Sequence, residues 1–429
     1  MGAITAGTVL PFGRNLAFAQ SSCEMNKKIL VVINMAGGVH SLSVLPPLQL
    51  QEYLDRHPDV GIRNALTLNS SIGLNPAMAN FANFYSGGMP GVGISLFNQV
   101  GFLNQTGADV TSRSHEVGTQ QYAAGLTNPY GSISSGWIGR FAKTYCVGSQ
   151  SAYNIVNLGG FGRALNEVDV PVVSAASLAG MSYTNDGTSV ANNKYVRDTI
   201  QEFNNSAPGA LHGQLYEQSN RTADSAVAML GQVRSAYSAA PAGLYVNGNP
   251  LNQRFMDAAA LINSWDLTKV SVIAMAQGGY DTHGAQGTAA PLVTGAYMGL
   301  ARLLQQLDQA IGSFYQDLKN RNLHQNVSVL VVSEFGRTFQ NENRTPEGAP
   351  SPGTDHGTGG FAALIGPGVR SQVAYSNLLP SYFTGTKNWL GAEVDIRSVY
   401  AAVLERHLGV DSAPIFPEAY IRANIPIYA

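Results

Sequence analysis

Three short apolar runs are the strongest pattern in the chain. They lie at 270–276, 327–332 and 361–365, and turn residues bound each of them. Between the first two runs, apolar residues recur in steps of four and three, which is typical of a helix. Short apolar runs separated by a helix indicate buried parallel strands, because a strand covered on both faces carries apolar side chains on both. The pattern therefore predicts an α/β fold with a mostly parallel sheet.

Polar residues of the kinds that bind metals adjoin all three runs. Asp281 and His283 follow the first run, and Glu334 follows the second. Asp355 and His356 come shortly before the third run. In open α/β sheets, ligands bind beyond the carboxyl ends of the strands. Carboxylates and imidazoles converging at that edge predict a metal site.

Two further turns offer candidate site residues. The apolar run 29–34 leads into Gly37 and Gly38, and His40 follows. Glycines at the end of a strand let the backbone approach a ligand closely, although a loop histidine satisfied by protein hydrogen bonds is the alternative. The polar segment 112–115 opens a predicted helix, where a serine is ordinarily a cap. A hydroxyl at a helix N-terminus is also a favourable position for a nucleophile or a bound anion.

The rest of the pattern predicts the other elements. We expect a helix at 76–85, with Asn75 as its N-cap and Pro76 as its first residue. The other expected elements are strands at 91–100 and 153–158, a helix from 136, a crossover helix at 293–318 and a helix capped by Asp395. The middle of the chain, about 185–264, is polar and mostly helical, with segments near 190–204, 210–239 and 250–264. It is most simply a helical insertion or cap beside the sheet.

Composition excludes some classes of function. The net charge is −2, so no basic surface indicates binding to nucleic acid. No apolar stretch reaches the roughly 18 residues of a membrane-spanning helix. A chain of 429 residues can bury a large core, in one large α/β domain or in two smaller ones. We expect one domain over 20–429.

The N-terminus resembles the end of an export signal. Residues 16–19 followed by Gln20 form an A-x-A cleavage pattern after a mildly apolar segment, so 1–19 is interpreted as the remnant of a longer signal, such as a twin-arginine signal. A disordered tail is the alternative. Mature protein would then begin near Gln20, in the periplasm or outside the cell. In such a compartment Cys23 and Cys146 could form a disulfide, and two free thiols remain the alternative.

Several ordered motifs carry a resemblance to a known family. They are Gly-Gly-Tyr-Asp-Thr-His (278–283), Ser-Glu-Phe-Gly-Arg-Thr (333–338), Gly-Thr-Asp-His-Gly (353–357), Asp-Ile-Arg-Ser-Val-Tyr (395–400), the segments 112–115 and 136–140, and the Gly37-Gly38 turn. Together they resemble the bacterial exported family known as domain of unknown function 1501, in the alkaline phosphatase/sulfatase superfamily. The resemblance covers 27 to about 409 and is weakest in the helical middle. It implies an alkaline-phosphatase-like three-layer α/β/α fold, metals (usually zinc) at the strand ends, and a Ser, Thr or formylglycine nucleophile near a helix N-terminus.

Two departures from that pattern matter. The family's first turn usually reads Gly-Gly-Asn-Asp-Gly, and its second Asp is expected to bind metal, whereas this chain has His40 at that position. Imidazole is also a good zinc ligand, but the replacement removes a negative charge and could tune or abolish one metal site. The chain also lacks the Cys-x-Pro-x-Arg and Ser-x-Pro-x-Arg motifs, which excludes formylglycine chemistry. The absence of a Gly-x-Ser-x-Gly motif disfavours an α/β-hydrolase.

The chemistry of ester hydrolysis supports the same expectation. Paired metals about 3.5–4 Å apart can stabilise the attacking and leaving oxygens in phosphate or sulfate ester hydrolysis. The expected metal ligands are Asp281, His283, Glu334, Asp355, His356, His40 and His115, and these donors fit one or two divalent ions, zinc first and manganese as the alternative. Arg113 and Arg337 could clamp the substrate anion, although a strand-end ion pair of Glu334 with Arg337 is the alternative.

Ser114 is the expected nucleophile, with Ser112 as the second candidate. Two classes of function stay open at this point. One is an exported metal-dependent hydrolase of small-molecule or polysaccharide phosphate or sulfate esters. The other is a non-catalytic secreted or cell-surface scaffold that retains the fold, and either class could have a protein partner or form an oligomer.

Overall fold

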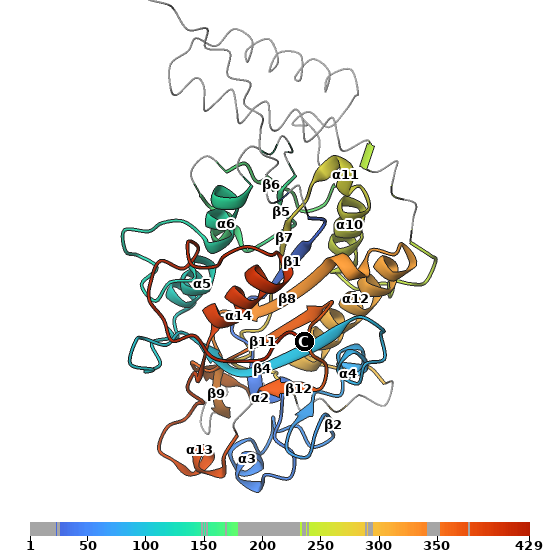
Figure 1. Ribbon diagram of the computed structural model, residues 1–429. Coiled ribbons are helices and arrows are strands. Elements are labelled where there is room, and N and C mark those ends of the chain that lie inside the picture. Colours follow the sequence, from blue (N-terminus) through green and yellow to red (C-terminus); the bar gives the residue numbers. More distant parts are fainter. Residues whose placement is uncertain are drawn as a thin grey trace, which may run out of the picture.

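A central sheet organises the chain (Figure 1). The computed structural model describes residues 23, 26–146, 149, 151, 153–167, 170–178, 232–233, 237, 240–287, 290, 295–340, 352–375 and 378–429. Among these residues, the main sheet has nine strands in the order β12–β4–β11–β8–β1–β7–β5–β6, with β13 beside β4. The strands are β1 Ile29–Met35, β4 Gly93–Gly101, β5 Ile155–Asn157, β6 Val173–Ser174, β7 Val272–Gln277, β8 Val327–Ser333, β11 Gly360–Gly366, β12 Val373–Tyr375 and β13 Val394–Asp395.

Helices cover both faces of this sheet. Side chains of β1 alternate between two apolar clusters: Ile29 and Val31 belong to one, and Leu30 and Val32 to the other. The first cluster contains residues of α4, α10 and α12, and the second contains residues of α5, α6 and α14. Because both faces are covered, every residue of β1 is buried, as the apolar run predicted. The three-layer α/β/α arrangement is therefore confirmed.

The helices complete the list of elements. They are α2 Ser41–Val44, α3 Gln51–Arg56, α4 Ala79–Tyr85, α5 His115–Ala124, α6 Trp137–Tyr145, α7 Gly162–Leu165, α10 Asn252–Asn263, α11 Trp265–Thr268, α12 Gly299–Asn320, α13 Pro380–Thr384 and α14 Ile396–Ala402, with a 3₁₀ turn at His324–Asn326 and a π turn at Val403–His407. Two small sheets pair β2 Leu66–Thr67 with β3 Gly73–Leu74 and β9 Arg337–Gln340 with β10 Thr354–His356.

Among the described residues, no helix is long and apolar enough to cross a membrane.

The direction of β11 corrects the expectation of three parallel strands. β1 pairs in parallel with β7 and β8, but β11 is antiparallel to both β8 and β4. The chain leaves β8, forms the β9–β10 hairpin, and re-enters the sheet from the same edge. A residue that precedes β11 therefore lies at the carboxyl edge of β8, whereas a parallel third strand would have placed it at the opposite edge.

Among the other predicted helices, one N-cap was confirmed and two helices begin later than predicted. Asp395 caps α14, since its side chain accepts a hydrogen bond from the Arg397 backbone N–H. The crossover helix is α12, which begins at Gly299 rather than at 293. The helix expected from Pro76 begins only at Ala79, which corrects that prediction. Asn75 instead holds a turn: its side chain accepts from the Ala77 N–H and donates to the Ser43 carbonyl.

Two further expectations concern the chain termini and the middle. The structure joins Cys23 and Cys146 by a disulfide, so the paired alternative is the one observed. The segment near 250–264 is confirmed as α10. The expected helix near 190–204, almost all of the one near 210–239, and the export-signal remnant lie outside the described residues.

A buried carboxylate from α12 replaces the missing cap of α4. Asp308 accepts hydrogen bonds from the backbone N–H groups of Asn80 and Phe81, at 3.0 and 2.8 Å, and from the Asn80 side chain. These amides belong to the first turn of the helix, which otherwise lacks partners for them. Burial raises the pKa of Asp308 to about 6, although the hydrogen bonds oppose that shift.

We predict that Asp308→Ala destabilises the protein by about 1–3 kcal/mol near pH 5, because two amides of α4 lose their acceptor. The folded-state pKa lies above that of an unfolded Asp, so the stabilising contribution is fully present below about pH 4 and is lost as pH rises through about 6. The difference from wild type should therefore shrink toward neutral pH. Urea unfolding across this range measures it, with Gln316→Ala on the same helix as control, and a difference that grows with pH would contradict the account.

Candidate functional site

The candidate residues gather at one edge of the sheet. Asp281 follows β7, Glu334 follows β8, His356 ends β10 just before β11, and His115 begins α5. The turn after β1 packs against this edge: a side-chain carbon at Gly37 would lie 2.4 Å from the Asp281 backbone nitrogen. Gly37 has a φ of +121°, which L side chains rarely adopt, so glycine is required there on both counts.

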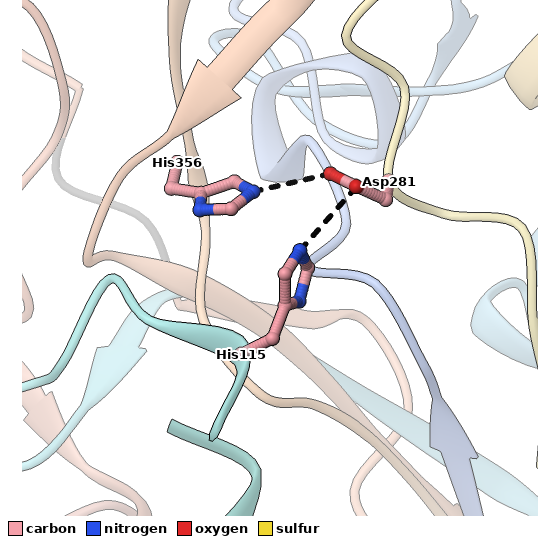
Figure 2. Close-up of side chains that lie close together, drawn as sticks. All are labelled: His115, Asp281 and His356. Atoms are coloured by element: carbon pink, nitrogen blue, oxygen red, sulfur yellow. Dashed lines mark hydrogen bonds and ion pairs between the residues drawn. The ribbon is translucent and has the colours of Figure 1, made fainter. Parts of the chain in front are cut away.

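One carboxylate faces two neighbouring imidazoles (Figure 2). The His356 Nε2 atom is 3.1 Å from Asp281 Oδ1, and the His115 Nε2 atom is 3.3 Å from Asp281 Oδ2. One ligand-type atom from each of the three residues lies within 4.8 Å of the others. Two imidazoles and a carboxylate are donors that can hold a divalent metal ion.

In both histidines, Nε2 faces Asp281 and Nδ1 forms a hydrogen bond on the far side of the ring. The His356 Nδ1 atom is 2.8 Å from the Arg113 carbonyl oxygen, and the His115 Nδ1 atom is 2.5 Å from Glu334 Oε1. A carbonyl or carboxylate oxygen accepts, so each Nδ1 donates and each Nε2 is the ring atom left for Asp281 or for a metal. A proton or a cation between the Nε2 atoms and the carboxylate would stabilise this arrangement.

A second group adjoins the first and shares His356. It consists of His283, Asp355 and His356. The His283 Nε2 atom lies 3.0 Å from Asp281 Oδ1 and 3.1 Å from His356 Nε2, while its Nδ1 atom lies 3.6 Å from Asp355 Oδ1. The structure therefore brings five of the seven expected metal ligands together: His115, Asp281, His283, Asp355 and His356.

The local electrostatics keep the carboxylates ionised and one imidazole neutral. Partial burial raises the pKa of Asp281, but the hydrogen bond and charge of Arg337 and the contact with His356 outweigh it, so its pKa is lowered. Partial burial also raises the pKa of Asp355, but the hydrogen bond from the His356 N–H and the charges of His283, His356 and Arg337 together outweigh it, so its pKa is lowered. Burial and the charge of Arg337 lower the pKa of His283. These are the protonation states that metal binding requires.

Glu334 lies behind the first group rather than within it. Its side chain is almost fully buried, with Oε1 against His115 and Oε2 accepting from the Thr119 hydroxyl at 3.0 Å. In metal sites, a carboxylate that holds the far nitrogen of a metal-binding histidine fixes the tautomer and the orientation of the ring. The geometry thus favours an orienting role for Glu334 over direct ligation.

Arg337 is also surrounded by protein acceptors. Its guanidinium donates to Asp281 Oδ1 at 2.8 Å, to the Gly37 carbonyl at 3.0 Å, and to the hydroxyl and carbonyl of Thr354 at 2.9 and 2.6 Å. The ion pair with Glu334, given above as the alternative, is not among these contacts. The arrangement favours a role in holding Asp281 and the neighbouring loops over contact with a substrate.

His40 lies beneath the two groups and belongs to neither. Its ring is fully buried, and its Nδ1 atom is 2.7 Å from the Ser43 hydroxyl and 3.0 Å from Gln286 Nε2. Burial lowers the pKa of His40 well below its usual value, with smaller contributions from His57 and Arg337, so its imidazole is neutral. The loop-histidine alternative therefore describes its surroundings better than the metal-ligand expectation.

The polar segment before α5 lies beside the first group through His115 and Arg113. Ser114 is the exposed N-cap residue of α5, and its hydroxyl makes no hydrogen bond within the described part of the chain. The Ser112 hydroxyl accepts from the Ser114 backbone N–H at 3.1 Å. Arg113 is exposed, with its guanidinium carbon 4.4 Å from the ring centre of Trp389. The free hydroxyl thus belongs to Ser114 rather than to Ser112.

Some residues of the site had no clear sequence signal. Phe335 is buried and packs against the rings of His115 and His356, with ring centres 5.0 and 4.8 Å apart. Its place within the Ser-Glu-Phe-Gly-Arg-Thr motif was the available signal. Gln286 contacts His40 at the end of an unpatterned loop, and nothing in the sequence distinguished it.

The fold and this edge define an α/β protein with a candidate metal centre. The family model described as "Protein of unknown function (DUF1501)" matches residues 27–380, so the chain belongs to that family. No curated protein matches the chain.

Solved structures with a similar fold come from the alkaline phosphatase superfamily. A superfamily protein from Vibrio parahaemolyticus is 11% identical with a TM-score of 0.37, over 92% of this chain and 70% of that chain. The lipoteichoic acid synthase LtaP from Listeria monocytogenes is 11% identical with a TM-score of 0.33, over 92% and 74%. The alkaline phosphatase from the Antarctic bacterium TAB5 is 13% identical with a TM-score of 0.32, over 84% and 96%. These likenesses concern the fold alone.

We predict that Arg337→Met lowers the free energy of unfolding by about 2–4 kcal/mol, because buried carbonyls and the Asp281 carboxylate lose a charged donor. The pKa of Asp281 should rise in the same variant. Urea unfolding in the presence of a chelator separates this effect from any metal. Arg370→Met, which removes an exposed arginine bonded to the Tyr428 carbonyl, is the control and should change stability little. Equal losses in the two variants would refute the structural role of Arg337.

Proposed function

We propose that this chain is an exported metal-dependent hydrolase of phosphate or sulfate esters. The observation that carries the proposal is the convergence of the His115 and His356 Nε2 atoms on the two oxygens of the Asp281 carboxylate. A divalent cation held by these three residues satisfies all of these atoms at once, and zinc suits nitrogen and carboxylate donors. When bound, such an ion supplies a Lewis acid that stabilises charge on ester oxygens.

The chain's own residues would do the remaining work. His283 and Asp355 lie beside the first group and would complete the coordination or hold a second ion. Ser114 would act as the nucleophile: its hydroxyl is exposed, makes no hydrogen bond within the described residues, and adjoins His115 in the chain. The N-terminus of α5 favours the negative charge that develops there. Arg113, exposed and unpaired with any acid among the described residues, would bind the substrate anion.

Export is supported by the cysteines and by the N-terminal pattern. The Cys23–Cys146 disulfide suits the periplasm or the extracellular space, where disulfides persist. A substrate there would be a small-molecule or polysaccharide ester.

A non-catalytic scaffold is the second candidate. The observation that favours it is His40, which replaces the expected acidic residue of the first turn and is held in hydrogen bonds with Ser43 and Gln286. A chain that lost one metal position could retain the fold for assembly with a partner. Metal bound without any ester hydrolysis would favour this candidate.

We predict that purified protein binds about one zinc ion per chain and that His356→Ala reduces the bound zinc at least tenfold, since this residue is common to both groups. Zinc should also raise the unfolding midpoint of the wild type, because it binds the native state. Elemental analysis after gel filtration measures the first effect and thermal unfolding the second. His324→Ala, which removes a histidine outside the site, is the control and should bind zinc as the wild type does. A measured content below about 0.1 zinc or manganese ion per chain, after both metals are supplied, would contradict the metal proposal.

We further predict that Ser114→Ala abolishes hydrolysis while zinc content and unfolding midpoint stay at wild-type values, because the nucleophile acts only in the chemical step. A panel of phosphate and sulfate esters, followed by release of the alcohol, measures the reaction. Ser112→Ala is the matched comparison and should retain activity. If only Ser112→Ala loses activity, the role of nucleophile belongs to Ser112. Full activity in both variants would exclude a serine nucleophile in this segment.

A further inference from the structure

A single buried amide joins three segments beneath the candidate metal centre. The Gln286 side chain is fully buried, and all of its contacts are to protein groups. Its Oε1 atom accepts from the hydroxyls of Thr282 and Thr354, at 2.9 and 2.7 Å. Its Nε2 atom lies 3.0 Å from His40 Nδ1 and 3.1 Å from the Ser43 hydroxyl. Two contacts at the amide oxygen and two at the amide nitrogen match the hydrogen-bonding capacity of this side chain.

The two threonines place this amide next to the candidate ligands. Thr282 follows Asp281 directly, and Thr354 lies two residues before His356 on β10. The backbone N–H of Thr354 also donates to the Thr282 carbonyl at 3.0 Å, so the two segments meet at this point. Small movements there would change the separation of Asp281 from His356, and metal affinity depends on that separation.

The direction of the hydrogen bonds is fixed from one end of the network. The Arg337 Nε–H donates to the Thr354 hydroxyl, so this hydroxyl donates its own hydrogen to Gln286 Oε1. The amide nitrogen of Gln286 therefore faces His40 Nδ1 and the Ser43 hydroxyl, and Nδ1 accepts from it when His40 carries its proton on Nε2. Among the described residues, neither this Nε2 atom nor the Nε2 atom of the nearby His57 has a hydrogen-bond partner. The His57 Nδ1 donates to the Tyr53 carbonyl, so its Nε2 is an acceptor. The centres of the two rings are 5.2 Å apart.

We propose that Gln286 is a positioning residue that sets the spacing of the Asp281 and His356 segments, and that His40 holds the nitrogen end of its amide. The proposal rests on the metal centre proposed above only for its consequence on affinity. It gives His40 a role through Gln286, Thr354 and Arg337 in place of metal ligation. A neutral imidazole suits that role, since a protonated ring could not accept from the amide at Nδ1.

Gln286→Met tests the proposal, because methionine has a similar volume and none of the amide's hydrogen bonds. We expect zinc affinity to fall at least tenfold, with a changed visible absorption spectrum of the cobalt-substituted protein. Asn249→Leu is the matched control: it removes a buried amide that bonds the Gln306 carbonyl and the Leu251 N–H, neither of which belongs to a candidate ligand. This control should lose stability and keep both the wild-type zinc affinity and the wild-type cobalt spectrum.

Hydrogen exchange of the Thr354 amide in metal-free protein gives a readout that does not need the metal. Protection should fall in Gln286→Met and stay unchanged in Asn249→Leu. Gln286→Glu retains an acceptor for both threonines, so it should restore most of the protection and most of the zinc affinity. If the wild type binds no metal, the proposed function fails, and Thr354 exchange still decides the role of Gln286. Wild-type exchange in a folded Gln286→Met protein would overturn the inference.

Discussion

The guanidinium of Arg337 is the contact on which the geometry of the site depends. It reaches the carbonyl of Gly37 after β1, the Asp281 carboxylate after β7, and both oxygens of Thr354 before β11, from its own position after β8. Four segments from distant parts of the chain therefore meet at one planar group. A planar group with five donors in fixed directions suits this task, and a lysine ammonium would not reproduce it. Because the side chain is buried, its charge also keeps Asp281 ionised at the edge of the solvent.

The direction of β11 explains why two separate motifs form one site. Asp355 and His356 precede their strand, whereas Asp281 and Glu334 follow theirs. In a wholly parallel sheet these pairs would lie at opposite edges. The antiparallel β11 brings them to the same edge, and the β9–β10 hairpin provides the connection. The convergence expected from the sequence was thus correct, but the parallel third strand on which it was based was wrong.

Sequence pattern predicted the layers better than it predicted the roles of individual residues. Continuous apolar runs identified β1, β7, β8 and β11, because burial on both faces leaves a simple signature. The predicted start of α4 was wrong. The carboxylate that accepts from the first-turn N–H groups of this helix belongs to Asp308, more than two hundred residues away in the chain. No local signal reports such a bond. Only the folded structure shows that Glu334 contacts the far nitrogen of His115 and does not join the group of candidate metal ligands.

The shared residue of the two groups bears on how many ions the site can hold. One imidazole nitrogen binds one cation, and His356 has only Nε2 available, because its Nδ1 donates to the Arg113 carbonyl. The two groups therefore compete for it. Charge acts in the same direction: Arg337 already offsets the Asp281 carboxylate, and His40 is neutral where the family pattern expects an acid. Asp355 remains as the other carboxylate of the two groups, so the balance of charge favours one divalent ion over two. The replacement at position 40 and the sharing of His356 thus both favour one ion over two in the proposed centre.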